Sequence, residues 1–217
     1  MNRYISALLL LGLVSCQDRY DAEKRILLDL HVTDQQGNSL AGKHMEIFAD
    51  DGSDYYIGGD SDLITYGNTD SNGNIRLVFP VRENYASVYA LNFEGDDEFE
   101  QTSYTLIKES DCVDYKVPVS ALTLLRAEET VTLSIESVPV SNQQLFWLTI
   151  EGPHSGNIAY SMPESDFDSN SYYYSDFQVA KNSSILIKYI TNLNGALTRH
   201  EQTVEIGTED VQYVLNY

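Results

Sequence analysis

Carboxylate side chains gather in three stretches of the sequence that carry turn residues rather than a strand pattern. The first stretch contains Asp50, Asp51, Asp54, Asp60 and Asp62. A second holds residues 96–98, and a third holds residues 164–168. Hard cations such as Ca²⁺ take about six to eight oxygen ligands in proteins. The sequence therefore predicts a calcium site around residues 50–62. The alternative is that these carboxylates only keep the surface soluble.

Tyrosine is frequent, with 16 residues in 217, and two groups are adjacent in the sequence. The groups are Tyr55 with Tyr56, and Tyr172 with Tyr173 and Tyr174. Neighbouring residues of a strand point to opposite faces, so at least one ring of each group should face solvent. Exposed tyrosine beside carboxylates suits the recognition of sugars or protein partners. The alternative is that these rings cover sheet edges.

The single tryptophan, Trp147, lies in the apolar run LFWLTI and is expected in a core.

The histidines show no pattern of a catalytic or metal site. His31, His44, His154 and His200 are spread over the sequence without a metal-ligand spacing inside one element. No glycine-rich phosphate loop or nucleophile elbow occurs. A hydrolase would need distant carboxylates assembled in an apolar pocket, where their pKa values shift. We therefore expect a noncatalytic protein with no cofactor beyond the Ca²⁺ ion considered above, and keep the hydrolase as an alternative.

The charge balance excludes one large class of partner. The chain has 13 Lys and Arg against 33 Asp and Glu, a formal net charge of −20. Nucleic acid binding needs clustered cations, so nucleic acid is not expected as a partner.

Cysteine is rare, because Cys16 and Cys112 are the only two. We expect Cys112 to be a half-buried small residue rather than a reactive thiol.

The N-terminal stretch has the organisation of a cleaved export signal. About ten mostly apolar residues, 5–14, follow Arg3, whereas a spanning helix needs about 20. The residues Leu13-Val14-Ser15-Cys16 resemble the lipobox of bacterial lipoproteins. The resemblance implies that residues 1–15 are removed and that Cys16 is acylated, so that the membrane is contacted through the lipid anchor. An ordinary secretory signal with a chance cysteine is the alternative.

Residues 16–25 are predicted to be the acylated cysteine and a solvated tether, because residues 17–25 carry six charges. Gln17, in place of aspartate, resembles lipoproteins sorted to the outer membrane. The acidic Asp18, Asp21 and Glu23 resemble export signals of Bacteroidota surface lipoproteins, although Arg19 interrupts them. Outer-membrane anchoring is therefore expected, with the periplasmic face and the cell surface both open.

Period-2 alternation of apolar residues runs through the rest of the chain and predicts an all-β fold. Residues 26–120 contain seven such segments, ending with 113–119, and residues 128–217 contain seven more, among them 157–162. Asn72-Gly73 and Asn194-Gly195 are strong hairpin signals. We expect two tandem seven-stranded β-sandwiches, immunoglobulin-like in general form, joined around residues 121–129. One larger open sandwich with a single core is the alternative.

The first unit also resembles a known family. Its residues form a D-x-x-G-x-x-L-x-G connection, followed by a T-D-x-x-G hairpin. The matching residues are Asp34, Gly37, Leu40, Gly42, Ile47, Thr69, Asp70, Gly73 and Ile75. This pattern resembles the carboxypeptidase regulatory-like, transthyretin-like domain of bacterial envelope proteins. Ser39 stands where that family often has proline, and Ile75 where an aromatic residue is common. The resemblance implies a transthyretin-like sandwich without an active site.

These observations together predict a lipid-anchored, noncatalytic protein of the cell envelope that acts as a binding or assembly accessory. Its partner would be a glycan or another envelope protein, recognised through the tyrosine groups. A structural subunit of a pilus or fimbria is an alternative, and it would require a strand able to leave its sheet and pair with a neighbour.

Overall fold

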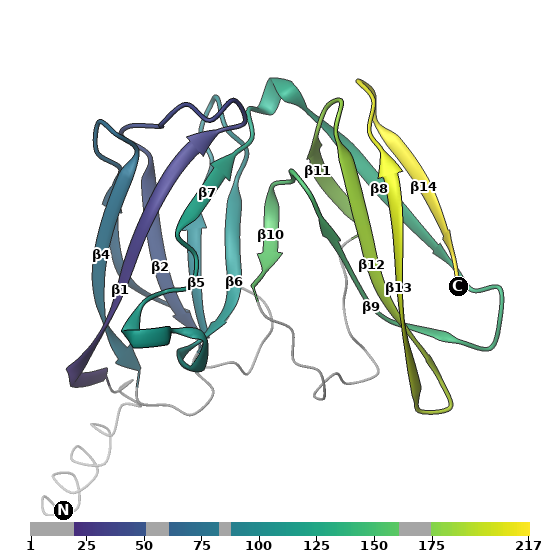
Figure 1. Ribbon diagram of the computed structural model, residues 1–217, viewed down its shortest axis with the longest axis horizontal. Coiled ribbons are helices and arrows are strands. Elements are labelled where there is room, and N and C mark those ends of the chain that lie inside the picture. The colour runs from purple at the N-terminus through teal and green to yellow at the C-terminus, as the bar shows by residue number, and fades with distance from the viewer. Residues whose placement is uncertain (1–19, 51–60, 83–87, 161–174) are drawn as a thin grey trace, which may run out of the picture.

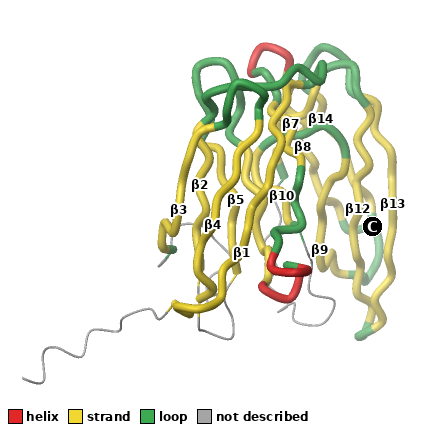
Figure 2. The backbone as a smooth tube through the Cα atoms, turned by 60° about the vertical axis from the view of Figure 1, so that its left-hand side comes forward, coloured by secondary structure: helices red, strands yellow, loops and turns green. Residues whose placement is uncertain are grey.

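A computed structural model shows a chain built almost entirely from strands (Figure 1). It describes residues 20–50, 61–82, 88–160 and 175–217. Fourteen strands and three short 3₁₀ turns lie in these ranges, so the all-β prediction is confirmed. The strands form four sheets. Figure 2 shows that most strands lie roughly along one common axis. The described ranges contain no helix with the length and apolar character needed to cross a membrane.

The first hydrophobic core lies between a three-stranded and a five-stranded sheet. The smaller sheet has the order β4-β1-β7, formed by Asn74–Arg82, Tyr20–Asp34 and Ala121–Leu124. The larger sheet has the order β10-β6-β5-β2-β3, formed by Gly156–Ala159, Thr102–Lys108, Val88–Phe93, His44–Asp50 and Asp62–Asn68. Strict alternation places Ile26, Leu28, Leu30 and Val32 of β1 on the buried face. The apolar period seen in the sequence thus decides which face of each sheet is covered.

The second core lies between two three-stranded sheets. One has the order β11-β8-β14, formed by Asp176–Ala180, Thr130–Val138 and Val211–Asn216. The other has the order β13-β12-β9, formed by Ala196–Glu205, Ser184–Leu193 and Gln144–Glu151. Ile185 and Ile187 of β12 and Leu133 of β8 are fully buried between them. Leu148 and Ile150 of β9, in the same sheet as β12, belong to the same buried cluster, so this half has its own packed interior.

Strand β10 corrects the predicted division into seven and seven strands. It comes from the second half of the sequence, yet it pairs in parallel with β6 at the edge of the five-stranded sheet. The backbone N–H of Gly156 donates to the Gln101 carbonyl at 2.8 Å, and that of Tyr160 to Thr105 at 2.9 Å. The first core is therefore flanked by eight described strands and the second by six. Local periodicity identifies a strand but not the sheet that it joins.

Two further boundaries differ from the prediction. Strand β1 begins at Tyr20, so it includes residues expected in the tether, and its N-terminal end pairs Tyr20 with Arg82. The expected strand 113–119 instead begins with the 3₁₀ turn η2 (Val113–Tyr115), which follows another such turn, η1 (Glu109–Asp111). Strand β7 and the turn η3 (Ala127–Glu129) occupy the stretch where the joint was expected. Asp114 and Tyr115 have positive φ angles of 52° and 57°, which interrupt an extended backbone.

The hairpin between β3 and β4 shows why the T-D-x-x-G motif folds as it does. The Asp70 carboxylate accepts hydrogen bonds from the backbone N–H groups of Asn72 and Asn74, at 2.8 and 2.9 Å. Gly73 has a φ of +75°, and a Cβ at this position would lie 2.6 Å from the carbonyl oxygen of Val32. Only glycine fits here, both for its φ angle and for the close approach of β1.

Candidate functional site

Most of the binding and metal residues predicted from the sequence lie outside the described residues. Asp51, Asp54, Tyr55, Tyr56 and Asp60 fall in 51–60, Tyr172, Tyr173 and Tyr174 in 161–174, and Cys16 in 1–19. Asp50 and Asp62 stand at the ends of β2 and β3, and Asp62 accepts a hydrogen bond from the Tyr20 hydroxyl at 3.0 Å. Within the described ranges, no three His, Cys, Asp or Glu side chains are grouped as metal ligands.

The described acidic residues of the second stretch have structural partners. Lys43 donates to Asp96 at 2.6 Å, and the Asp96 carboxylate also accepts from the backbone N–H groups of Glu98 and Phe99. Glu98 pairs with the Arg126 guanidinium. Asp96 therefore shapes a turn and Glu98 contributes to a joint, a structural role that neither the calcium prediction nor the surface alternative gave them.

The described residues form a cleft of about 1040 Å³ that the sequence did not lead us to expect. One wall belongs to the first half and includes Tyr104 of β6, Thr123 of β7, and Ile158 and Tyr160 on or after β10. The other wall belongs to the sheet β13-β12-β9. The turn 152–154, which connects β9 to β10, joins the two walls. Because β10 hydrogen-bonds to the first half while β9 stays in the second, this short connection fixes one wall to the other.

Cross-strand register arranges the second wall in rows. Ile190 of β12 stands between Trp147 of β9 and Arg199 of β13. In the next row, Lys188 stands between Thr149 and Glu201. All six residues line the cleft, because strand periodicity places them on the sheet face opposite the core residues Ile187 and Tyr189.

A β-bulge explains why Trp147 lies in the cleft rather than in the core. The register shifts between Ile190 and Thr191, which pair with Trp147 and Leu145, so Phe146 is the extra residue of β9. The bulge lets Leu145 pack against the second core while Phe146 and Trp147 both line the cleft. The prediction that Trp147 is a core residue, and that 145–150 is buried on both faces, is therefore wrong.

The charged residues on this wall compensate one another. The Lys188 ammonium lies 2.5 Å from a Glu151 carboxylate oxygen and 3.8 Å from a Glu201 oxygen. The hydrogen bond to Glu151 raises the pKa of Lys188, and the two carboxylates add to that effect. With Arg199, the lining holds two permanent cations against two carboxylates. The cleft is thus electrically balanced in a chain whose formal net charge is −20.

His154 lies at the turn where the two walls meet. It is 9% exposed, and its Nδ1 is 2.9 Å from the Gly152 carbonyl oxygen, which makes that nitrogen the donor. Burial lowers the pKa of His154, and the hydrogen bond to Gly152 opposes this effect only in part. The ring is therefore neutral at pH 7, and its role in the described structure is to hold the turn.

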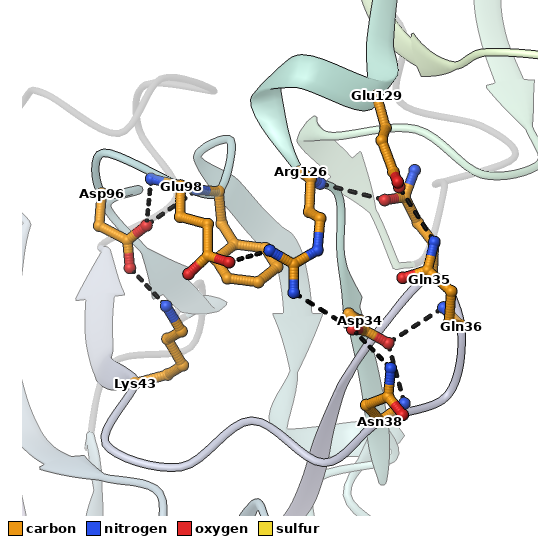
Figure 3. Close-up of polar contacts among 10 residues, drawn as sticks. Asp34, Gln35, Gln36, Asn38, Lys43, Asp96, Glu98, Arg126 and Glu129 are labelled. Carbon is orange, nitrogen blue, oxygen red and sulfur yellow. Dashed lines mark hydrogen bonds and ion pairs between the residues drawn. The ribbon is translucent and has the colours of Figure 1, made fainter.

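A network of polar side chains, the polar joint, lies around Arg126, where the first half of the chain leads into the second (Figure 3). The Arg126 guanidinium pairs with Glu98 and with Asp34, the latter at 3.4 Å, and lies 4.8 Å from the Phe99 ring centroid. Its backbone N–H donates to the Gln35 side chain at 3.1 Å. This network ties the turn after β1 to the chain segment that enters β8.

Two more contacts extend the joint to the second half. Gln36 donates to the Glu129 carboxylate at 3.0 Å, and the Lys181 ammonium donates to the Glu128 carbonyl at 2.6 Å. Burial alone would raise the pKa of Asp34, yet hydrogen bonds from Asn38, Arg126 and Gln36 hold that pKa below its usual value. The joint therefore contains an ionised, 2% exposed carboxylate with several donors around it.

Comparisons with known proteins give no assignment. No family model matches the sequence, and no curated protein matches it. Among solved structures, the shaft pilin SpaA from Lactobacillus rhamnosus GG is 11% identical, with a TM-score of 0.33 over 89% of this chain and 96% of the pilin. The Streptococcal ancillary pilin is 11% identical, with a TM-score of 0.29 over 90% of this chain and 62% of the pilin.

A protein from Bacteroides eggerthii DSM 20697, provisionally described as a cell adhesion protein, is 8% identical, with a TM-score of 0.25 over 92% of this chain and 88% of that protein. These three similar structures are thus two pilins and a protein described as an adhesion protein. Because their TM-scores are below 0.5, these likenesses carry no inference about what the present chain binds.

Proposed function

We propose that this protein is a noncatalytic binding accessory of the bacterial cell envelope, anchored in the outer membrane through an acylated Cys16. Its ligand, a glycan or an envelope protein, binds in the cleft between the two halves. The observation that carries the proposal is the cleft wall itself, where Trp147, Ile190 and Arg199 form one row beside the polar row of Lys188. Aromatic residues with a few converging polar groups in a concave site are typical of ligand binding.

The single tryptophan makes a direct test practical, because all tryptophan emission comes from Trp147. The full chain, purified in detergent, is titrated with envelope fractions from which protein has been removed, because the tryptophans of other proteins would mask the emission of Trp147. A ligand in the cleft changes the intensity or wavelength and protects the ring from acrylamide. If no envelope fraction changes the emission, the cleft is not the binding site.

The anchor has its own test. Cells that express the full chain are labelled with radioactive palmitate, and Cys16→Ala is the control variant. We expect label in the wild-type protein and none in the variant. Label in neither would contradict the lipid anchor, and the protein would then follow the ordinary secretory alternative.

The sites predicted outside the described residues stay proposals. We propose calcium binding by the acidic stretch 50–62, and a contribution of Tyr55, Tyr56 and Tyr172–Tyr174 to partner recognition. A melting curve with calcium against a chelator tests the first, and unchanged melting would contradict it. Loss of an identified partner when the tyrosines become alanine tests the second, and retained affinity would contradict it.

A structural subunit of a polymer is a second candidate, and β10 is the observation that favours it. This strand has only four residues and occupies one edge of the five-stranded sheet, where a strand from another copy would also fit. Light scattering of the full chain tests this function, because a strictly monomeric protein contradicts it. Where polymers form, Ala159→Cys with Thr105→Cys locks β10 in place. Polymers that persist in the locked protein would show that β10 does not exchange.

A further inference from the structure

We propose that the cleft binds a neutral oligosaccharide, with one sugar ring stacked on Trp147 and hydroxyl groups bonded to the charged row beside it. This inference rests on the proposed function, since it names the ligand class of the same cleft. It follows from three properties of the wall: the order of its rows, its charge balance and its size.

The two rows match the two chemical faces of a pyranose ring. Trp147 and Ile190 offer a flat aromatic and aliphatic surface, which fits the C–H face of a sugar. One row away, Lys188 and Glu201 offer an ammonium and a carboxylate, which donate to and accept from vicinal hydroxyls. Adjacent rows of one sheet face are about 7 Å apart along a strand, as the rise per residue implies. A ring seated on Trp147 therefore has its hydroxyl edge within reach of the polar row.

The charge balance selects against ionic ligands. An anionic sugar would meet Glu151 and Glu201 in a chain with a net charge of −20. A cationic ligand would meet Lys188 and Arg199. An acyl chain would remove four charged groups from water without replacing their hydrogen bonds, which is strongly unfavourable. A neutral molecule with many hydroxyls keeps every one of these groups hydrogen-bonded.

The size of the cleft favours several linked rings over a single small molecule. Its volume of about 1040 Å³ lies at the upper limit of small-molecule pockets, which run from about 300 to 1,000 Å³. Tyr104 and Tyr160 line the opposite wall, and Tyr160 is 41% exposed. These rings offer further stacking surfaces to the next units of a chain.

An extended peptide is the main alternative ligand for the cleft, and the experiment below includes one. In the described ranges, β9 pairs only with β12, and β10 only with β6, so each has an edge to which a peptide strand could bond. Such binding would depend on backbone pairing along an edge and only weakly on the charged row. Substitution of that row therefore separates the two ligands.

The experiment is a fluorescence titration of the full chain in detergent, with Trp147 as the probe. Neutral hexasaccharides of glucose, mannose and galactose are compared with hexagalacturonate and with an extended apolar peptide. We expect at least one neutral hexasaccharide to bind, with an affinity that changes less than about twofold between 50 and 500 mM salt, because screening does not affect an uncharged ligand.

Variants are measured by calorimetry so that the probe itself can be replaced. Trp147→Ala should weaken binding by roughly 30-fold or more, and Glu201→Gln by roughly tenfold, as expected for a central aromatic anchor and a charged hydrogen bond. The matched control is Tyr66→Ala. Tyr66 is 63% exposed on β3, at the opposite edge of the five-stranded sheet from β10, and its loss should leave the affinity unchanged.

Each outcome decides something. Binding of a neutral hexasaccharide with these variant effects supports the inference. Binding of only hexagalacturonate or only the peptide overturns it, while the proposed cleft function stands. Affinity that Tyr66→Ala reduces as much as Trp147→Ala also overturns it. If neither these ligands nor any envelope fraction changes Trp147 emission, the inference and the proposed function both fail.

Discussion

Trp147 on β9 and Arg199 on β13 stand in the same row of one sheet face, each in register with Ile190 of β12. Both residues line the cleft between the two halves. An aromatic ring and a guanidinium separated by one aliphatic side chain form a surface that is apolar in the middle and polar at one end. A ligand that lies across the three strands therefore meets both chemistries at once.

The polar joint should contribute measurably to stability. Replacing Arg126 by methionine removes its pairs with Asp34 and Glu98 and leaves the 2% exposed Asp34 with fewer donors. We expect the free energy of unfolding to fall by about 1–2 kcal/mol in urea denaturation. Lys24→Met is the control, because the pair of Lys24 with Glu109 at 3.8 Å is about half exposed and such pairs contribute about 0–1 kcal/mol. Equal losses in both variants would contradict the role of the joint.

Substitutions at two glycines can distinguish the cost of backbone strain from the cost of a steric clash. Gly37 and Gly73 have similar φ angles of +81° and +75°, but only Gly73 approaches another backbone atom, the carbonyl oxygen of Val32. Gly37→Ala should lower the free energy of unfolding by about 1 kcal/mol, the cost of a left-handed conformation. Gly73→Ala should cost about 3 kcal/mol, since β1 must also shift. Thermal unfolding of both variants measures the difference, and similar losses would show that the contact is not tight.

The lowered pKa of His154 predicts that the folded protein loses stability in mildly acidic solution. Its pKa in the folded protein lies below the ordinary 6.5, so the unfolded chain takes up the proton first as the pH falls. Stability is therefore complete above about pH 6.5 and falls below it, by up to about 1.4 kcal/mol per pH unit. His154→Asn keeps a donor for the Gly152 carbonyl and should flatten the urea-denaturation profile between pH 6.5 and 5. A variant with the wild-type slope would contradict this assignment.

Cys112 should be almost inert in the folded protein. Burial raises its pKa to about 11, and the neighbouring Asp111 and Glu109 add to this effect. The thiolate fraction at pH 8 is then about two orders of magnitude below that of an ordinary cysteine. A maleimide probe should label the native chain slowly and the urea-unfolded chain rapidly. Native labelling at the unfolded rate would show that the thiol is accessible and ionised.

Alternation of apolar residues was sufficient to predict most strands. The pattern of Ile26, Leu28, Leu30 and Val32 gives β1, and Val131, Leu133 and Ile135 give β8, in each case with the apolar set buried. Asn194 and Gly195 do form the turn between β12 and β13, both with positive φ angles. These features are local, since they depend on the period of a strand and on residues that tolerate left-handed backbone.

Features that depend on distant pairing could not be predicted in the same way. Strand β10 was identified, but nothing in its four residues indicates that it pairs with β6. The turn η2 requires Asp114 and Tyr115 to adopt positive φ angles, which aspartate tolerates but which the bulkier tyrosine disfavours. Both outcomes are decided by tertiary contacts rather than by local propensity.

The cleft was not predicted because a bulge in β9 interrupts the alternation of its residues, although part of that alternation is visible in the sequence. Trp147, Thr149 and Glu151 alternate with Leu148 and Ile150, so the polar residues mark an outward face that includes the tryptophan. The apolar pair Leu145 and Phe146 obscured this alternation. A register shift of one residue accommodates both the apolar pair and the alternation that follows it. Register between strands is not visible in one sequence.

Acrylamide quenching of Trp147 distinguishes a tryptophan in the cleft from one in a core, because the chain has no other tryptophan. The native full chain is measured alone and with a saturating envelope fraction, and the urea-unfolded chain gives the upper limit of quenching. We expect clear quenching in the native protein and protection when ligand is present. Emission that acrylamide barely quenches in the free native protein would place Trp147 in a core and contradict the cleft.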